Sequence, residues 1–141
     1  MKLLLSAIFI VISIPLAAQP ADSTKCRSVG PEDFLTLMRF EEKAVIIDVR
    51  MPVEFRKERI ENSVNIPVSK TEKKISAAAG YESVLLIYCT TGYRSIRVAS
   101  KYYDLGYHNV YNLEGGIEAW KKKGLTVIKK RRAKGEERRA K

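Results

Sequence analysis

Apolar residues in this chain form short runs, and segments with helical spacing separate them. Residues 84–88 make an unbroken apolar run, residues 45–47 make a shorter one, and residues 64–67 and 110–113 are expected to form two further short strands. A run of this length between turn residues is typical of a strand buried in a parallel sheet. The intervening helices are expected at residues 31–38, 53–58, 70–79, 93–105 and 117–123. This alternation over residues 28–128 predicts a single α/β domain: a central parallel sheet with helices on both faces.

The helix expected after residue 88 has the clearest amphipathic spacing. Ile96, Ala99 and Tyr103 would share one face, which is expected to pack on the sheet. Gly106 follows the last turn and is a suitable C-terminal stop, because glycine readily adopts the left-handed conformation found there. The strand at residues 84–88 therefore leads through a short loop into this helix.

That loop holds the candidate chemistry. It contains, in order, Cys89, Thr90, Thr91, Gly92, Tyr93, Arg94 and Ser95. Ligands of open α/β sheets bind at the carboxyl ends of strands, where loop amides and the helix dipole favour an anion. A thiol there, with Arg94 nearby, is expected to ionise easily and attack an electrophile. The alternative is a buried cysteine that acts only as a small hydrophobic residue; the small, cationic and donor-rich loop favours the reactive interpretation.

Asp48 and Arg50 follow a second expected strand, so they should approach the same edge of the sheet. One interpretation makes them supports that hold the loop or line the entrance to the site. The other makes them a surface ion pair, which contributes little to stability. The sequence leaves both open.

Four motifs occur in a fixed order along the chain. They are Asp48-Val49-Arg50 with Glu54-Phe55; Asn65-Ile66-Pro67; the loop Cys89 to Ser95; and Leu105-Gly106-Tyr107 continuing to Gly115-Gly116 and Trp120. Together they resemble the single-domain rhodaneses, a family of sulfurtransferases, over residues 28–128. One departure is Glu58-Arg59-Ile60, where the family often has Gly-His-Ile, and it leaves the acceptor preference open.

The resemblance implies that Cys89 takes sulfane sulfur as a persulfide from a small donor and passes it to a thiol or to cyanide. Backbone N–H groups of residues 90–95 would stabilise the sulfur anion. Arg94 would neutralise or orient a donor such as thiosulfate. Thr90 and Thr91 would either add hydroxyl donors or be exposed loop residues with no role. No cofactor and no metal is expected.

Three alternatives use the same residues. The protein could instead be a persulfide carrier that serves a sulfur-relay partner, or a non-catalytic binding module. A cysteine-dependent phosphatase is less favoured, because those enzymes need Cys-x5-Arg to surround a phosphoryl group. Cys89 and Arg94 form a shorter Cys-x4-Arg loop.

The first eighteen residues have the pattern of a secretory signal. Met1-Lys2 is basic, residues 3–16 are almost wholly apolar, and Ala17-Ala18 offers a small-residue cleavage site. We therefore expect export to the periplasm or the medium, with an uncleaved N-terminal membrane anchor as the alternative. A flexible start is expected over residues 19–27. Cys26, in that stretch, is either an unimportant or partner-linked thiol or a resolving partner of Cys89.

The net charge of +10 does not imply a nucleic-acid partner, because much of it lies at the C-terminus. Residues 129–141 hold eight basic and two acidic residues and almost no apolar ones, so a disordered tail is expected. Such a tail is either simply solvated or suited to contact with anionic lipid or cell-envelope polymer.

Overall fold

The computed structural model describes residues 26–130. The expected signal at residues 1–18 and most of the expected tail lie outside the described residues. Within them the chain forms one five-stranded sheet, and each pair of neighbouring strands in it is parallel. The strands, in spatial order, are β1 (Arg27–Val29), β6 (Val110–Leu113), β5 (Val84–Tyr88), β2 (Ala44–Asp48) and β4 (Val64–Asn65). The predicted α/β fold with a central parallel sheet is confirmed.

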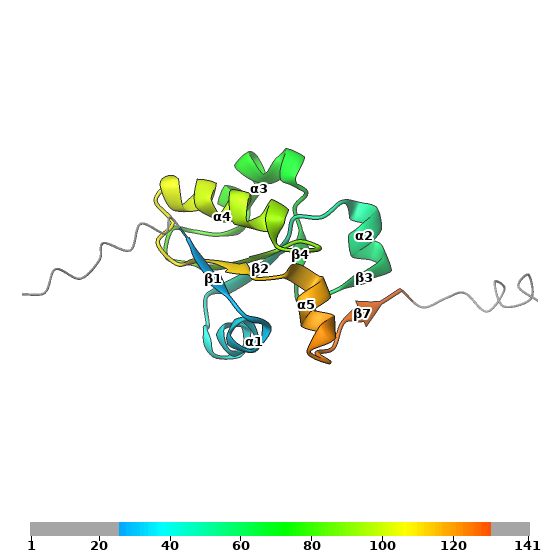
Figure 1. Ribbon diagram of the computed structural model, residues 1–141. Coiled ribbons are helices and arrows are strands. Elements are labelled where there is room, and N and C mark those ends of the chain that lie inside the picture. The colour runs from blue at the N-terminus through cyan, green and yellow to red at the C-terminus, as the bar shows by residue number, and fades with distance from the viewer. Residues whose placement is uncertain (1–25, 131–141) are drawn as a thin grey trace, which may run out of the picture.

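Helices cover both faces of this sheet. They are α1 (Pro31–Phe40), α2 (Pro52–Lys57), the 3-10 turn η1 (Val68–Lys70), α3 (Thr71–Ala78), α4 (Tyr93–Asp104) and α5 (Gly116–Lys122). Figure 1 shows α3 and α4 on one face and α1 and α5 on the other. A second, two-stranded antiparallel sheet joins β3 (Glu58–Arg59) to β7 (Ile128–Lys129). None of the helices within residues 26–130 is both long and apolar enough to cross a membrane.

Side chains of β5 alternate between two apolar clusters. Leu85 and Ile87 belong to the cluster under α3 and α4, whereas Leu86 and Tyr88 belong to the cluster that includes residues of α1 and α5. Successive strand residues point to opposite faces, and here both faces are buried, which explains the continuous apolar run. Cys89 continues the alternation and falls with the α4 cluster. The strand register thus fixes the face to which the thiol belongs.

The buried face of α4 differs from the predicted one. Tyr102 is fully buried, whereas Tyr103 is 38% exposed, so the prediction for Tyr103 was wrong. The buried positions are Ser95, Val98, Ala99 and Tyr102. They have the i, i+3, i+4, i+7 spacing of one helical stripe. The helix is therefore rotated so that Ser95, in its first turn, faces inward beside Cys89.

Both ends of the domain extend beyond the predicted bounds. Cys26 is buried and Arg27 opens β1, so these two residues are not part of a flexible start. At the other end Lys129 pairs with Glu58 in β7, and the Lys130 N–H donates to the carbonyl of Lys57. The expected disordered tail therefore does not include residues 129 and 130. Sequence patterning missed these edges because strands of two or three residues carry little periodicity.

Candidate active site

Cys89 lies at the carboxyl end of β5, in the turn that opens α4. Gly92 is the N-cap of α4 and has a φ of +89°. Glycine adopts this left-handed conformation without the steric cost that a Cβ imposes. The turn brings the start of α4 back over the thiol. Cys89 and Ser95, six residues apart, are in direct contact as a result.

Hydrogen-bond donors converge on the sulfur. The Gly92 N–H lies 3.2 Å from the Cys89 Sγ, and the Ser95 hydroxyl oxygen lies 3.4 Å from it. Cys89 itself is fully buried. Donors aimed at a buried sulfur favour its anionic form, because a thiolate accepts hydrogen bonds far better than a thiol. The loop is therefore arranged for an anionic sulfur.

The ionisation of Cys89 follows from two opposing effects. Burial is the largest single effect and raises the pKa of the thiol. The Ser95 hydroxyl and the backbone N–H groups of Ser95, Thr91 and Arg94 stabilise the thiolate, and together they outweigh burial. The net result is a pKa below the ordinary value for cysteine. A lower pKa gives a larger fraction of thiolate at a given pH, and the thiolate is the nucleophilic form of cysteine.

Replacing Ser95 by alanine should raise the pKa of Cys89, because the hydroxyl is the strongest stabiliser of the thiolate. We expect the midpoint of Cys89 alkylation by iodoacetamide, followed against pH by peptide mass, to move to higher pH. Ser100→Ala is the matched control, since Ser100 lies on the same helix but contacts Cys26 instead. A midpoint unchanged in Ser95→Ala would contradict this role.

Glu54, on α2, is a site residue that sequence reasoning missed. Its carboxylate accepts hydrogen bonds from Arg94 at 3.1 and 3.2 Å and from the Thr90 hydroxyl at 2.9 Å. Arg94 also donates to the Thr90 hydroxyl oxygen at 2.8 Å. The contact with Arg94 is the main reason why the pKa of Glu54 falls to about 2. Glu54 therefore stays ionised near neutral pH, and Arg94 is paired with its carboxylate.

Glu54→Gln should make the site more receptive to anions, because Arg94 would lose its charged partner. The rate of Cys89 alkylation by iodoacetate, divided by the rate with neutral iodoacetamide, should rise about threefold. Arg94→Gln should lower the same ratio, since it removes the cation. A ratio that responds to neither substitution would show that Arg94 has no influence on anions at the sulfur.

The structure places Asp48 and Arg50 as an internal ion pair. Their exposed fractions are 0% and 3%, and the closest nitrogen–oxygen distance is 2.7 Å, so the surface alternative was wrong. Arg50 also donates to the Glu58 carbonyl at 2.6 Å and lies over the Tyr88 ring at 5.7 Å. Asp48 pairs with Tyr88 in the strand register. The pair therefore supports the end of β5 from the face opposite to the thiol.

The first amides of α5 hold the other side of the loop. The Ile117 N–H donates to the Cys89 carbonyl at 2.9 Å, and the Glu118 N–H donates to the Thr90 carbonyl at 3.1 Å. A trans peptide directs its N–H opposite to its carbonyl, so the bond from α5 to the Thr90 carbonyl fixes the peptide whose Thr91 N–H stabilises the thiolate. Thr91 and Tyr93 have exposed side chains, at 70% for Tyr93, and lie on the rim of the site.

Cys26 and Cys89 are far apart in the folded domain. The register of β1, β6 and β5 places Cys26 level with Leu85, four residues before Cys89 and two strands away. That separation is about 13 Å along the strand and about 10 Å across the sheet, beyond the roughly 7 Å that a disulfide spans. Both cysteines are free, and the Cys26 Sγ instead lies 3.5 Å from the Ser100 hydroxyl. The folded domain therefore does not support a resolving role for Cys26.

Residues 26–130 contain no group of three or more His, Cys, Asp or Glu side chains placed to hold a metal ion. The groups that surround the Cys89 sulfur are N–H, hydroxyl and guanidinium donors, which bind anions and not cations.

Known proteins share this architecture. The family model for the rhodanese-like domain matches residues 31–123. An uncharacterised protein of Synechocystis is 31% identical over 114 residues, which cover 80% of this chain but only 63% of that protein's length. A thiosulfate sulfurtransferase of Coxiella burnetii is 36% identical over 77 residues, covering 55% of this chain and 71% of the relative. The crystal structure of a rhodanese-related protein from Thermoplasma volcanium is 29% identical with a TM-score of 0.65, covering 72% of this chain and 97% of that one.

Proposed function

The chain belongs to the rhodanese-like sulfurtransferase family, and we propose that it moves sulfane sulfur from an anionic donor to a nucleophilic acceptor through a persulfide on Cys89. Thiosulfate is the proposed donor, and a thiol or cyanide the proposed acceptor. One observation carries this proposal: hydrogen-bond donors converge on the buried Cys89 sulfur and lower its pKa.

The proposed reaction has two displacement steps. The Cys89 thiolate attacks the outer sulfur of thiosulfate, a new S–S bond forms, and sulfite leaves with the electron pair of the broken S–S bond. The acceptor then attacks the outer sulfur of the persulfide, and the electron pair of the second broken bond returns to Cys89. Cyanide becomes thiocyanate, and a thiolate acceptor becomes a persulfide. No external oxidant or reductant takes part.

The loop supplies electrostatic stabilisation to both steps. Each step has an anionic nucleophile and an anionic leaving group, so no proton is transferred, and fixed N–H donors stabilise the sulfur anion of Cys89 without a general base. Arg94, oriented by Glu54 and Thr90, would attract the donor and neutralise its departing group. Gly92 permits the turn, and Ser95 donates its hydroxyl hydrogen to the thiolate.

The geometry does not favour a phosphatase. The donors close around a single sulfur atom, and the loop is one residue shorter than Cys-x5-Arg. A persulfide carrier would use the same sulfur and the same donors, and it differs only in receiving sulfur from a relay protein.

Three assays on the purified protein test the proposal. We expect thiocyanate from thiosulfate and cyanide, no hydrolysis of p-nitrophenyl phosphate, and a mass increase of one sulfur atom, about 32 Da, on the Cys89 peptide after donor treatment. A mass increase without turnover would indicate a carrier. Ester hydrolysis without the adduct, or neither reaction, would overturn the sulfur-transfer proposal.

We further propose that the protein is exported, on the strength of the basic, apolar and small-residue order of residues 1–18. N-terminal sequencing of protein taken from cells should then begin at Gln19. A chain that retains Met1 in the membrane fraction would indicate an anchor, and a chain that retains Met1 in the cytosol would overturn export.

The tail beyond residue 130 remains a proposed contact for anionic surfaces.

A further inference from the structure

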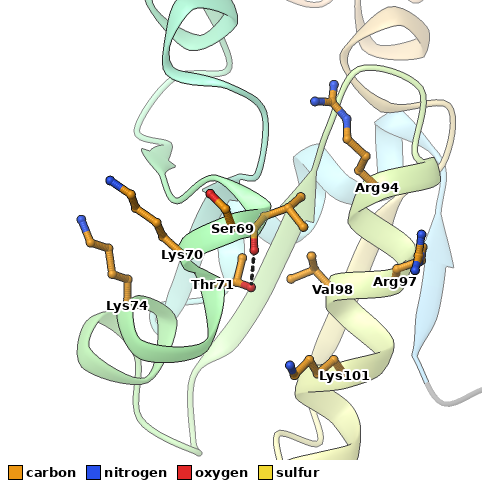
Figure 2. A pocket seen from close by; sticks show the side chains of 9 residues that line it. Ser69, Lys70, Thr71, Lys74, Arg94, Arg97, Val98 and Lys101 are labelled. Atoms are coloured by element: carbon orange, nitrogen blue, oxygen red, sulfur yellow. Dashed lines mark hydrogen bonds between the residues drawn. The ribbon is translucent and has the colours of Figure 1, made fainter.

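The Cys89 loop is open on one side and supported on the other. On the α4 face, Figure 2 shows a cavity of about 800 Å³ between the η1–α3 segment and α4, and Arg94 is one of its lining residues. On the opposite face, the first amides of α5 hold the loop carbonyls, and none of the described residues of α2, β3 or α5 lines that cavity. A residue on the supported side can therefore act on the sulfur by fixing the loop, without contacting a ligand in the cavity.

Glu58, in β3, makes contacts in three directions on the supported side. Its carboxylate accepts a hydrogen bond from the Lys121 ammonium group of α5 at 2.5 Å. Its carbonyl accepts a hydrogen bond from the Arg50 guanidinium at 2.6 Å, and its backbone pairs with Lys129 of β7. The bond from Lys121 is the main reason why the pKa of Glu58 lies below its ordinary value. Glu58 therefore joins α5 and β7 to the buried Asp48–Arg50 pair.

The contacts continue from β3 to the residue before the thiol. The Ile60 N–H donates to the Tyr88 hydroxyl oxygen at 3.1 Å, and Arg50 lies over the Tyr88 ring. Tyr88 immediately precedes Cys89, whose carbonyl is held by the start of α5. A closed path of contacts thus leads from Cys89 through α5 and Glu58 to Tyr88 and back to Cys89. It fixes the chain on both sides of the sulfur.

The bond between Glu58 and Lys121 is a direct connection between β3 and α5. Within the described residues β3 has one strand partner, β7, and each of these strands is two residues long. A two-stranded sheet of this size is only marginally stable by itself. The side chain of Glu58 is 18% exposed, and it reaches the same helix whose first turn holds the loop. This ion pair therefore contributes to the position of β3 beside the end of β5.

We propose that Glu58 is a positioning residue for Cys89: its bond to Lys121 closes the path of contacts and keeps the loop in the orientation that stabilises the thiolate. The inference goes beyond the sulfur transfer proposed above and rests on it only for the effect on turnover. The family often has glycine where this chain has Glu58, and glycine has no side chain that could bind Lys121. The ion pair therefore distinguishes this chain from relatives that have the glycine.

Position and charge predict opposite shifts for Glu58→Lys. A cation in place of a carboxylate would stabilise a nearby thiolate, so charge alone would move the midpoint of Cys89 alkylation by iodoacetamide to lower pH. The substitution also replaces the bond to Lys121 by repulsion, and a displaced loop would point fewer donors at the sulfur. We therefore expect the midpoint to move to higher pH. A midpoint that stays in place or moves to lower pH would overturn the positioning role.

Exchange of the two charges supplies the rescue. Lys121→Glu alone should also move the midpoint to higher pH, and Glu58→Lys combined with Lys121→Glu should restore it, because the pair forms again with its charges exchanged. The matched control is Glu32→Lys, which makes the same change in charge at a second ion pair. There Lys123, the C-cap of α5, binds Glu32 of α1 at 2.7 Å. This control should leave the midpoint unchanged. A midpoint that stays raised in the exchanged pair would contradict the proposal.

Turnover separates this inference from the proposed function. At a pH below the midpoint, kcat/KM for thiosulfate with cyanide as acceptor should fall about threefold in Glu58→Lys, within the range that a partly exposed ion pair contributes. The exchanged pair should recover it. Turnover in the unaltered protein with no shift of the midpoint in Glu58→Lys would overturn the positioning role alone. A shifted midpoint without turnover in the unaltered protein would overturn sulfur transfer and leave Glu58 as a residue that positions the thiolate.

Discussion

Replacing Cys89 by serine should abolish sulfur transfer and leave the fold intact. A serine hydroxyl does not ionise near neutral pH and forms no persulfide, so activity should fall by at least about 10³-fold. The Gly92 N–H and Ser95 hydroxyl that donate to the sulfur can donate to a serine oxygen at the same position. Because the polar contacts persist, the free energy of unfolding should change by no more than about 1 kcal/mol.

Thiocyanate formation, the mass of the Cys89 peptide and a urea denaturation curve measure these three expectations. Cys26→Ser is the matched control, because Cys26 is also buried and also lies beside a serine hydroxyl, but far from the candidate site. It should keep full activity. Unfolding of Cys89→Ser would show that the residue mainly packs the core, and loss of turnover in Cys26→Ser would restore a catalytic role to the second thiol.

The position of Cys89 could be predicted because it depends on local sequence alone. An apolar run that ends at Tyr88, followed by a glycine-containing turn and a helix, fixes the edge of the sheet at which the thiol lies. The anion-binding groups are largely backbone N–H donors, so their presence needs no particular side chain beyond Gly92 and Ser95. Neither the strand nor the turn requires knowledge of tertiary contacts.

The pairing of Arg94 could not be predicted in the same way. Glu54 and Arg94 are forty residues apart, and only the docking of α2 against the loop brings them together. The available signal was the place of Glu54 three residues after Met51, whose N–H its carboxylate accepts at the start of α2. A capping residue predicts where a helix begins, but it does not predict that the same Glu54 carboxylate also binds Arg94. Packing also determines which side of α4 faces the sheet: Tyr102 is buried there, whereas Tyr103 is partly exposed.

Gly116→Ala should be the most disruptive single-methyl change in the site. A Cβ at Gly116 would lie 2.4 Å from the Thr90 carbonyl oxygen and 2.5 Å from the Cys89 carbonyl oxygen, and φ at this residue is +59°. Both neighbours are backbone atoms that cannot rotate away. The clash and the left-handed backbone should together lower the free energy of unfolding by about 3 kcal/mol or more.

The same change should disturb the ionisation of Cys89. Any shift that relieves the clash moves α5 away from the loop and lengthens the bonds from Ile117 and Glu118 to the Cys89 and Thr90 carbonyls. The peptide units between Cys89 and Gly92 are then free to turn, and fewer N–H groups face the sulfur. The alkylation midpoint of Cys89 should therefore move to higher pH, which is opposite to the shift that a more ordered anion site would produce.

Gly30→Ala is the control for both measurements. Gly30 is the N-cap of α1 with a φ of −66°, and a Cβ there meets no atom within 4 Å. Its urea curve and alkylation profile should resemble those of the unaltered protein. If Gly116→Ala behaved like Gly30→Ala in both assays, α5 would not be holding the loop. The donors around Cys89 would then have to be oriented by α4 alone, through the left-handed turn at Gly92.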